Sequence, residues 1–520
     1  MKIVTAAEMT ALEQSSERYG VSTDTLMENA GLVVAEVSRD LMGGAAGKRV
    51  LVLVGPGNNG ADGLVTGRHL ARWGAGVTAY VVRGRPNPDP KMDIALRYGM
   101  SVADAANDPN LATLDRLLSR SDLVVDAILG TGRSRPLTGI VGDVIARLNN
   151  ATRNSRRPII VAMDLPTGLN CDTGEVDPAC PQVDVTVALG RPKVGLLTFP
   201  GAERAGRLEV AGIGLPPDLP EERDILLELL TPERERLPER PANSHKGTFG
   251  HALVIAGSRN YVGAAYLASQ ASVRTGAGLT TLASARNVYP IAAGKLTEVI
   301  HLPLPEDGAG MIHSEAARLL RPSLSRYNAL LVGCGLGWSP GTEGLLQALL
   351  LGDPPLPVPV VVDADGLNSL SGIADWQSKL RSPAVLTPHP GEMATLTGMS
   401  TADVQRDRVG MAREWSQRWN STVVLKGALT VIAEPGGLVR VAPFANPGMA
   451  SAGTGDVLSG IITGLLAQGL DTTDAACCGV YLHGMAGATV TQTLGNAGSL
   501  ASDLLEQIPA AIRLLKQRPS

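Results

Sequence analysis

The stretch Lys48–Gly60, KRVLVLVGPGNNG, is a short β-branched run that ends in a glycine-rich turn. Three further runs end in the same way, with a Gly or Asp loop: VTAYVVRG at 77–84, SDLVVDAILGTG at 121–132 and RPIIVAMDLPTG at 157–168. Helical patterns such as ADGLVTGRHLARWG, at 61–74, lie between the first three. This alternation predicts a doubly wound, Rossmann-like α/β domain with a parallel sheet. Ligands of such sheets bind beyond the carboxyl ends of the strands.

A second alternation follows after a break. The first pattern fades near Gly214, and residues 216–244 are rich in Pro, Glu and Arg, as is typical of a linker or an exposed edge. Strand-like runs start again at GHALVIAGS, 250–258, and helical patterns run from Asp456 to the C-terminus. We therefore expect two α/β domains, residues 1–218 and 219–520.

The composition excludes several classes of protein. The 520 residues are 44% hydrophobic and 18% charged, which is ordinary for globular domains with real cores. The net charge of −4 and the lack of a basic block argue against nucleic acid or an anionic membrane as a partner. We find no apolar run long enough to span a membrane and no signal peptide. The five cysteines lack CxxC spacing and are expected in the core. A cytoplasmic enzyme is predicted.

The loop GPGNNG fits the G-x-G-x-x-G pattern of dinucleotide sites, which is a weak signal alone. A Rossmann NAD site also needs an acidic residue at the end of the second strand, and here that strand ends with Arg83 and Arg85. Simple NAD binding is therefore disfavoured, whereas a site for a 2′-phosphate stays open. Asn58, Asn59 and Asp62 place three oxygen-bearing side chains in one turn, although turn chemistry alone could explain them.

Two carboxylates stand at the ends of later strands, Asp126 and Asp164. Near-buried carboxylates need a cation, hydrogen-bond donors or a substrate hydroxyl as partner. Asn59, Asp126 and the hydroxyl of Thr167 would form a hard-oxygen cluster, which suits an alkali or alkaline-earth ion better than zinc. The loop GTGRSRP, at 130–136, adds flexible backbone and two arginines, which suits a phosphate.

Together, LMENAG, GPGNNGADG, DAILGTGRSRPLTG and MDLPTGLNCDTG resemble the NAD(P)H-hydrate epimerase family over nearly all of the first domain. The resemblance implies a potassium ion on Asn59, Asp126 and Thr167. The chain departs from the family pattern at two positions. It has Ala61 where the family usually has Gly, which puts in doubt any requirement for a positive φ at that position. It has Thr167 where Ser is usual. The implied contacts to the hydrated nicotinamide nucleotide are Asn58, Asn59, Gly60, Ala61, Asp62, Gly130, Thr131, Gly132, Arg133, Ser134, Arg135, Pro136 and Asp164.

The second domain carries its own candidates. Lys246 and Lys426 each precede a glycine, which suits phosphate binding, although surface lysines in turns look the same. His389 stands between two prolines and is either an aimed or an exposed side chain. In NPGMASAGTGDVLSG, at 446–460, a glycine turn opens a helix and so offers backbone N–H groups to an anion. Asp456 follows at once, as a base or as a helix cap.

The motifs DADGLN, TPHPGE, LKGALT and AGTGDVLSG, in this order, resemble the ribokinase-like superfamily. Within it, HKGTFGHALVIAGS, YVGAAYLASQASVRTGAGL, GCGLG and NPGMASAGTGDVLSG resemble the ADP/ATP-dependent NAD(P)H-hydrate dehydratase branch. The implied contacts to the hydrated cofactor are Ala264, Gly335, His389 and Asp456. The implied contacts to ADP or ATP, which would carry Mg²⁺, are Lys426, Gly427, Ala428, Leu429, Thr430 and Gly455.

These resemblances predict a fused repair enzyme for hydrated NADH and NADPH. The first domain would interconvert the R and S hydrates, with Asp164 in acid–base work. The second would dehydrate the S hydrate, with Asp456 taking the proton of the hydroxyl that attacks the nucleotide. The alternative is a ribokinase-like vitamin kinase with a non-catalytic nucleotide-binding N-terminal domain. The expected partners are small molecules, and we expect a homo-oligomer.

Overall fold

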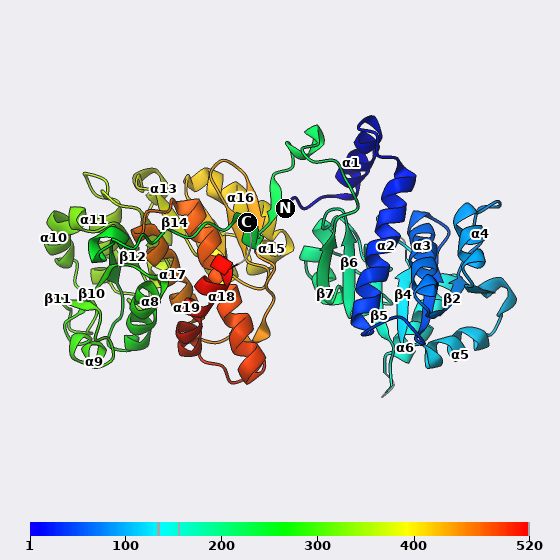
Figure 1. Ribbon diagram of the computed structural model, residues 1–520. Coiled ribbons are helices and arrows are strands. Elements are labelled where there is room, and N and C mark those ends of the chain that lie inside the picture. Colours follow the sequence, from blue (N-terminus) through cyan, green and yellow to red (C-terminus); the bar gives the residue numbers. More distant parts are fainter. Residues whose placement is uncertain (133–135, 154–155, 518–520) are drawn as a thin grey trace. The chain divides into compact units, whose positions relative to one another are not determined.

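The computed structural model describes residues 1–132, 136–153 and 156–517 (Figure 1). The chain divides into two compact units, Met1–Leu226 and Leu227–Ser520. The division falls within the segment expected to be a linker or exposed edge. Within the described ranges, none of the helices has the length and apolarity needed to cross a membrane.

The first unit is built on a seven-stranded sheet of order β3-β2-β1-β4-β5-β6-β7, in which all neighbours are parallel. The strands are β1 (Arg49–Val54), β2 (Gly76–Val81), β3 (Ser101–Asp104), β4 (Leu123–Ala127), β5 (Ile159–Met163), β6 (Val185–Leu189) and β7 (Arg207–Ala211). The helices are α1 (Ala6–Arg18), α2 (Thr23–Leu41), α3 (Asn58–Arg72), α4 (Pro90–Arg97), α5 (Ala112–Arg120), α6 (Gly139–Ala151) and α7 (Gly201–Arg204).

Helices cover both faces of this sheet, which explains why β1 reads as an unbroken apolar run. Side chains alternate along a strand, so neighbouring residues of β1 enter different cores. Val52 belongs to the buried cluster of Val34 in α2 and Leu64 in α3. Leu53 belongs to the other cluster, with Leu148 in α6. The predicted doubly wound architecture of the first half is confirmed.

The second unit has a ten-stranded sheet of order β11-β10-β9-β12-β13-β14-β15-β16-β17-β8. Its strands are β8 (Leu227–Leu229), β9 (His251–Ile255), β10 (Leu279–Ala285), β11 (Ile300–Leu304), β12 (Ala329–Val332), β13 (Val360–Val362), β14 (Ala384–Leu386), β15 (Thr422–Leu425), β16 (Val431–Ala433) and β17 (Val439–Val441). Its helices are α8 (Val262–Thr275), α9 (Tyr289–Ala293), α10 (Ala316–Leu320), α11 (Pro340–Leu350), α12 (Asp365–Ser371), α13 (Trp376–Lys379), α14 (Pro390–Thr397), α15 (Thr401–Arg406), α16 (Arg408–Trp419), α17 (Thr454–Ala467), α18 (Thr472–Leu494) and α19 (Ala501–Gln517).

This sheet is parallel from β11 to β15, and β16 then pairs antiparallel with both of its neighbours. The helix α17 packs against α8 and α18 (Figure 1). The edge strand β8 comes from the Pro-, Glu- and Arg-rich segment and pairs with β17. That segment is therefore not a plain linker, because part of it completes the second sheet. The α/β class predicted for the second half is confirmed.

Candidate active sites

A pocket of about 90 Å³ in the first unit lies at the carboxyl ends of β1, β4 and β5. Strand-end loops and the start of α3 supply its polar walls, while α1 and α2 close its side. The structure thus brings together residues from distant motifs of the sequence. The predicted residues among its walls are Asn58, Asn59, Asp62, Gly130, Thr131 and Asp164. The predicted contacts outside the described residues are Arg133, Ser134 and Arg135.

Four other predicted contacts are not among the walls of this pocket: Gly60, Ala61, Gly132 and Pro136. A Cβ atom at Gly60 would lie 2.0 Å from the carbonyl oxygen of Gly55, so glycine is needed there for the loop to close. Ala61 lies inside α3 and has no positive φ, which removes the question raised by its departure from the family pattern.

Arg85, the candidate for a 2′-phosphate site, is engaged by the protein itself. Its guanidinium donates hydrogen bonds of 2.9 Å to the carbonyl oxygens of Gly55 and Gly57. It also pairs with Asp89 at 2.7 Å. Arg85 therefore stabilises the backbone of the glycine-rich loop through these hydrogen bonds.

Asp164 directly follows β5, in the left-handed region with φ of +66°, and is largely buried. Its carboxylate forms an ion pair with Lys193, whose side chain is 1% exposed. Lys193 also donates to the carbonyl oxygen of Leu189 at 2.8 Å, and the Leu189 N–H donates to Asp164 at 3.0 Å. Sequence reasoning missed Lys193, although a lysine in GRPKVG, just after a strand-like run, is a signal that could have found it.

Two more carboxyl groups line this pocket, Glu13 from α1 and Asp62 from α3. Burial, together with the charges of Asp164 and Glu13, raises the pKa of Asp62 well above its ordinary value. The Oδ1 atom of Asp62 is buried and has no hydrogen-bond partner among the described residues. Burial also raises the pKa of Glu13, against the opposing charge of Lys193. The pocket thus gathers three carboxyl groups around one ammonium group.

The three predicted potassium ligands come together beside this pocket. Thr167 donates to Asp126 from its N–H at 2.8 Å and from its hydroxyl at 2.7 Å. Asn59 donates to the carbonyl oxygen of Leu129 at 3.1 Å, and the Leu129 N–H donates to the Thr167 hydroxyl at 3.2 Å. Asp126 is fully buried, and its pKa is raised by burial. No ion pair to Asp126 is found within the described part of the chain.

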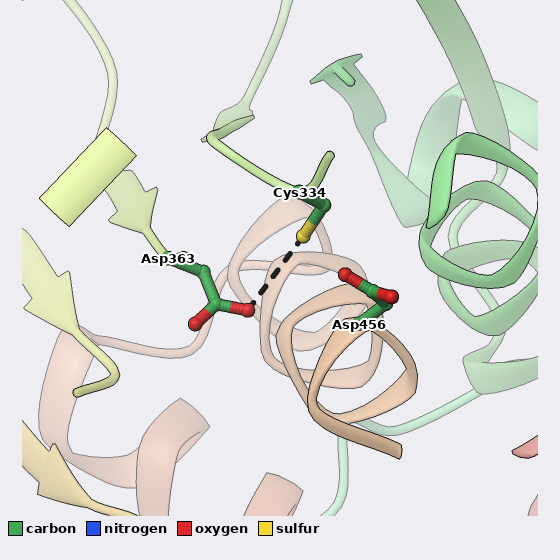
Figure 2. A group of neighbouring side chains, drawn as sticks. All are labelled: Cys334, Asp363 and Asp456. Carbon is green, nitrogen blue, oxygen red and sulfur yellow. Dashed lines mark hydrogen bonds between the residues drawn. The ribbon is translucent and has the colours of Figure 1, made fainter. Parts of the chain in front are cut away.

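In the second unit, polar residues follow four neighbouring strands. Cys334 comes after β12, Asp363 after β13, His389 after β14 and Lys426 after β15. The start of α17 adds Asp456, and Figure 2 shows its carboxylate facing Cys334 and Asp363. One ligand atom from each of these three side chains lies within 4.8 Å of the others.

Asp363 is the buried anchor of this cluster. Lys426 contacts its carboxylate at 2.6 Å, and the hydroxyls of Thr387 and Ser459 donate to it at 2.8 Å each. Burial alone would raise its pKa, but the ammonium of Lys426 and these hydrogen bonds hold the pKa below its ordinary value. Asp363 therefore stays ionised, because the ammonium of Lys426 and the two hydroxyls stabilise its negative charge.

Asp456 has a different environment. It lies in the first turn of α17, whose N-cap is Gly453, so the helix-cap alternative for Asp456 is wrong. Burial and the nearby charge of Asp363 raise its pKa to about 7. Two carboxylates of one cluster are thus separated in proton affinity, which is the arrangement found where one of them moves a proton.

Lys426 serves two neighbours at once. Besides Asp363, its ammonium lies 3.5 Å from Glu392. A Cβ atom added at Gly455 would lie 3.4 Å from the Lys426 ammonium, which places that charge beside the first turn of α17. The following loop has positive φ at Gly427 and Leu429. The cation and the free N–H groups of the helix start together favour a phosphate.

The remaining predicted contacts lie around the same cluster. His389 caps α14, because its Nδ1 accepts from the N–H groups of Gly391 and Glu392, while its side chain is 56% exposed. A Cβ atom at Gly335 would lie 2.8 Å from the Cβ of Ala264, so these two residues adjoin next to Cys334.

Sequence reasoning missed four residues of this cluster: Cys334 and Asp363, which lie beside Asp456, Glu392, which lies beside Lys426, and Ser459, which donates to Asp363. Asp363 had a visible signal, because it ends the strand-like run in PVVVDADGLN.

Comparison with known proteins covers both units. The family model described as NAD(P)H-hydrate dehydratase matches residues 252–510, and that of the YjeF-related protein N-terminus matches residues 23–195. A bifunctional NAD(P)H-hydrate repair enzyme of Moorella thermoacetica is 42% identical over 99% of this chain and 98% of its own. The chain belongs to the family of bifunctional NAD(P)H-hydrate repair enzymes. A second bifunctional NAD(P)H-hydrate repair enzyme, from Thermofilum pendens, is 37% identical over 99% of this chain and 97% of its own.

A crystal structure is similar to the second unit. It is the ADP/ATP-dependent NAD(P)H-hydrate dehydratase of Bacillus subtilis, co-crystallised with ATP and Mg²⁺. It is 32% identical, covers 55% of this chain and 98% of its own, and has a TM-score of 0.49. Membership of the NAD(P)H-hydrate repair family, which rests on the full-length relatives, confirms the predicted enzyme class and disfavours the vitamin kinase alternative.

Proposed function

We propose that this chain repairs hydrated NADH and NADPH in two steps. The first unit interconverts the R and S hydrates, and the second dehydrates the S hydrate at the expense of ADP or ATP. We assign the first activity to residues 1–218 and the second to residues 219–520; the existence of two compact units, divided after Leu226, supports this assignment. The observation that supports the proposal best is the placement of Asp456, a half-buried carboxylate of raised pKa in the first turn of α17.

Dehydration needs a better leaving group than hydroxide. Asp456 takes the proton of the substrate hydroxyl, and that oxygen attacks the terminal phosphate of the nucleotide, whose bond to the bridging oxygen breaks and releases AMP from ADP or ADP from ATP. The hydroxyl becomes a phosphate ester, which leaves as inorganic phosphate while the ring nitrogen supplies electrons. The N–H groups at the start of α17 and the ammonium of Lys426 stabilise the charge on the transferred phosphate. Loss of a proton from the adjacent ring carbon to solvent then restores the dihydronicotinamide ring of NADH or NADPH.

Mg²⁺ fits this site only together with the nucleotide. The side chains of the cluster are two carboxylates and the thiol of Cys334, and a thiol is a poor partner for a hard cation. Asp363 is already engaged by Lys426. Mg²⁺ usually keeps several waters and binds through phosphates and one or two carboxylates. When bound, it would neutralise phosphate charge and would be held mainly by the phosphates and by water.

Potassium fits the first unit. Asp126 is a fully buried carboxylate with hydroxyl and N–H donors but no cationic side chain among the described residues. Asn59 and Thr167 add neutral oxygens, so the donor set is the hard-oxygen kind that alkali ions prefer. We propose that these three residues hold potassium, which would order the loops around the pocket. Asp164 remains our choice for proton transfer on the ring.

The test is to incubate the protein with mixed R and S hydrates and either ADP or ATP. Complete return of both epimers to NADH, with one phosphate released for each, supports the proposal. A phosphorylated product that accumulates would instead indicate a kinase. Return of the S hydrate alone would leave the first unit without its proposed activity. The homo-oligomeric state and the cytoplasmic location stay predictions.

A further inference from the structure

The geometry of the first pocket points to Asp62 as the acid that works opposite Asp164. We infer that Asp62 gives the proton to the departing hydroxyl of the hydrate, and that Asp164 takes the proton of the water that adds to the other face. The inference rests on the proposed epimerase function and identifies a second proton-transfer residue for that reaction.

The contrast between the two carboxyl groups carries the inference. Asp164 is half of an ion pair with Lys193 and also accepts the N–H of Leu189. Asp62 lines the same pocket, yet its buried Oδ1 finds no partner within the described residues. A buried polar atom without a partner is costly, so such an atom at a ligand pocket is available for a substrate hydroxyl.

The protonation of Asp62 is consistent with an acid. The groups that bear on it are Asp164, Glu13, Lys91 and Arg85. Burial and the two carboxylates outweigh the two cations, so the pKa of Asp62 lies well above its ordinary value. A carboxyl group that its surroundings keep protonated beside a substrate can act as the acid, and Asp62 has such surroundings.

The chemistry balances. The bond between the ring carbon and its hydroxyl breaks, the proton of Asp62 makes the departing group water, and the ring nitrogen forms a C=N bond with its lone pair. A second water then bonds to the same carbon from the opposite face, gives its proton to Asp164, and returns the electron pair to nitrogen. Exchange with solvent reloads Asp62 and unloads Asp164. One water leaves and one enters for each inversion.

The experiment follows conversion of pure R hydrate to S by the full-length protein, without nucleotide, in ¹⁸O-labelled water and from pH 5 to pH 10. We expect one ¹⁸O atom per inversion and a loss of rate at high pH as Asp62 ionises. Asp62→Asn should lower the rate by about 10²- to 10⁴-fold and abolish the alkaline limb in what remains. Asp108→Asn is the matched control, because Asp108 is equally buried but holds the start of α5 through Thr113 and Leu114.

Folding of the variant can be checked separately. A carboxyl group whose pKa is raised in the folded state destabilises that state once the pH exceeds the unfolded pKa, so Asp62→Asn should not lower the melting temperature at pH 7. The inference is overturned if an alkaline limb of the wild type persists unchanged in Asp62→Asn, if no ¹⁸O enters, or if Asp62→Asn keeps more than about a tenth of the rate. A wild type without any epimerisation would overturn the proposed function instead.

Discussion

Dehydration by the second unit should depend on pH through Asp456. Its pKa of about 7 means that the carboxylate form falls to about one tenth at pH 6 and about one hundredth at pH 5. A base must be ionised, so the rate should fall in that proportion as the pH decreases. The terminal phosphate of the nucleotide also titrates near pH 6, so the existence of an acid limb is not decisive. A shift of this acid limb in a variant of a residue beside Asp456 is decisive.

Cys334→Ala supplies that displacement. The thiol donates a weak hydrogen bond to Asp363 at 3.6 Å and also lowers the pKa of the neighbouring Asp456, so its removal should move the acid limb to higher pH. A hydrogen bond of about 1 kcal/mol corresponds to a shift of about 0.7 pH units. The assay is dehydration of pure S hydrate at saturating ATP, with Cys478→Ala as a buried-thiol control on α18. A limb that stays in place, or that moves equally in the control, would refute Asp456 as the titrating base.

Three further outcomes are expected. Asp456→Asn should reduce dehydration by about 10²- to 10⁴-fold while calorimetry shows nearly unchanged nucleotide binding; retention of a tenth of the rate would contradict its role as base. Asp126→Ala should weaken epimerisation and its potassium dependence and leave dehydration of S hydrate intact; equal loss of both activities would argue against the cation site. A chain divided after Leu226 should yield two soluble, active halves, whereas division after Arg240 should destabilise the second half by removing β8; insoluble halves from the first cut would count against independent units.

Both sheets could be predicted from the sequence because their central strands are buried on both faces. Such strands read as unbroken apolar runs, and the polar residue that ends each run marks the edge where ligands bind. Asp126 and Asp164 were found in this way, whereas Asp456 was found from the glycine turn that opens its helix. The short edge strand β8 was not, because three residues in a Pro-rich segment carry no periodic signal.

The partners of the candidate catalytic groups were harder to predict. Lys193 meets Asp164 across 29 positions of the chain, and Lys426 meets Asp363 across 63. Such pairs depend on which strand ends become neighbours, and the local hydrophobic pattern of the sequence does not determine the order of strands in a sheet. The unpartnered oxygen of Asp62 is likewise a property of packing. Sequence reasoning therefore found the loops and several reactive groups, whereas the structure supplied what surrounds each group.

The burial of all five cysteines has a consequence for resistance to oxidants and alkylating reagents. The thiolate is the reactive form of cysteine, and burial raises the pKa of each thiol, with Cys334 also facing the charges of Asp456 and Asp363. Cys334 therefore lies beside the proposed base as an inert thiol. Iodoacetamide and mild peroxide should leave the folded protein active, and labelling should begin only when it unfolds. An enzyme that rescues damaged cofactors would itself keep its thiols from oxidation and alkylation while it stays folded.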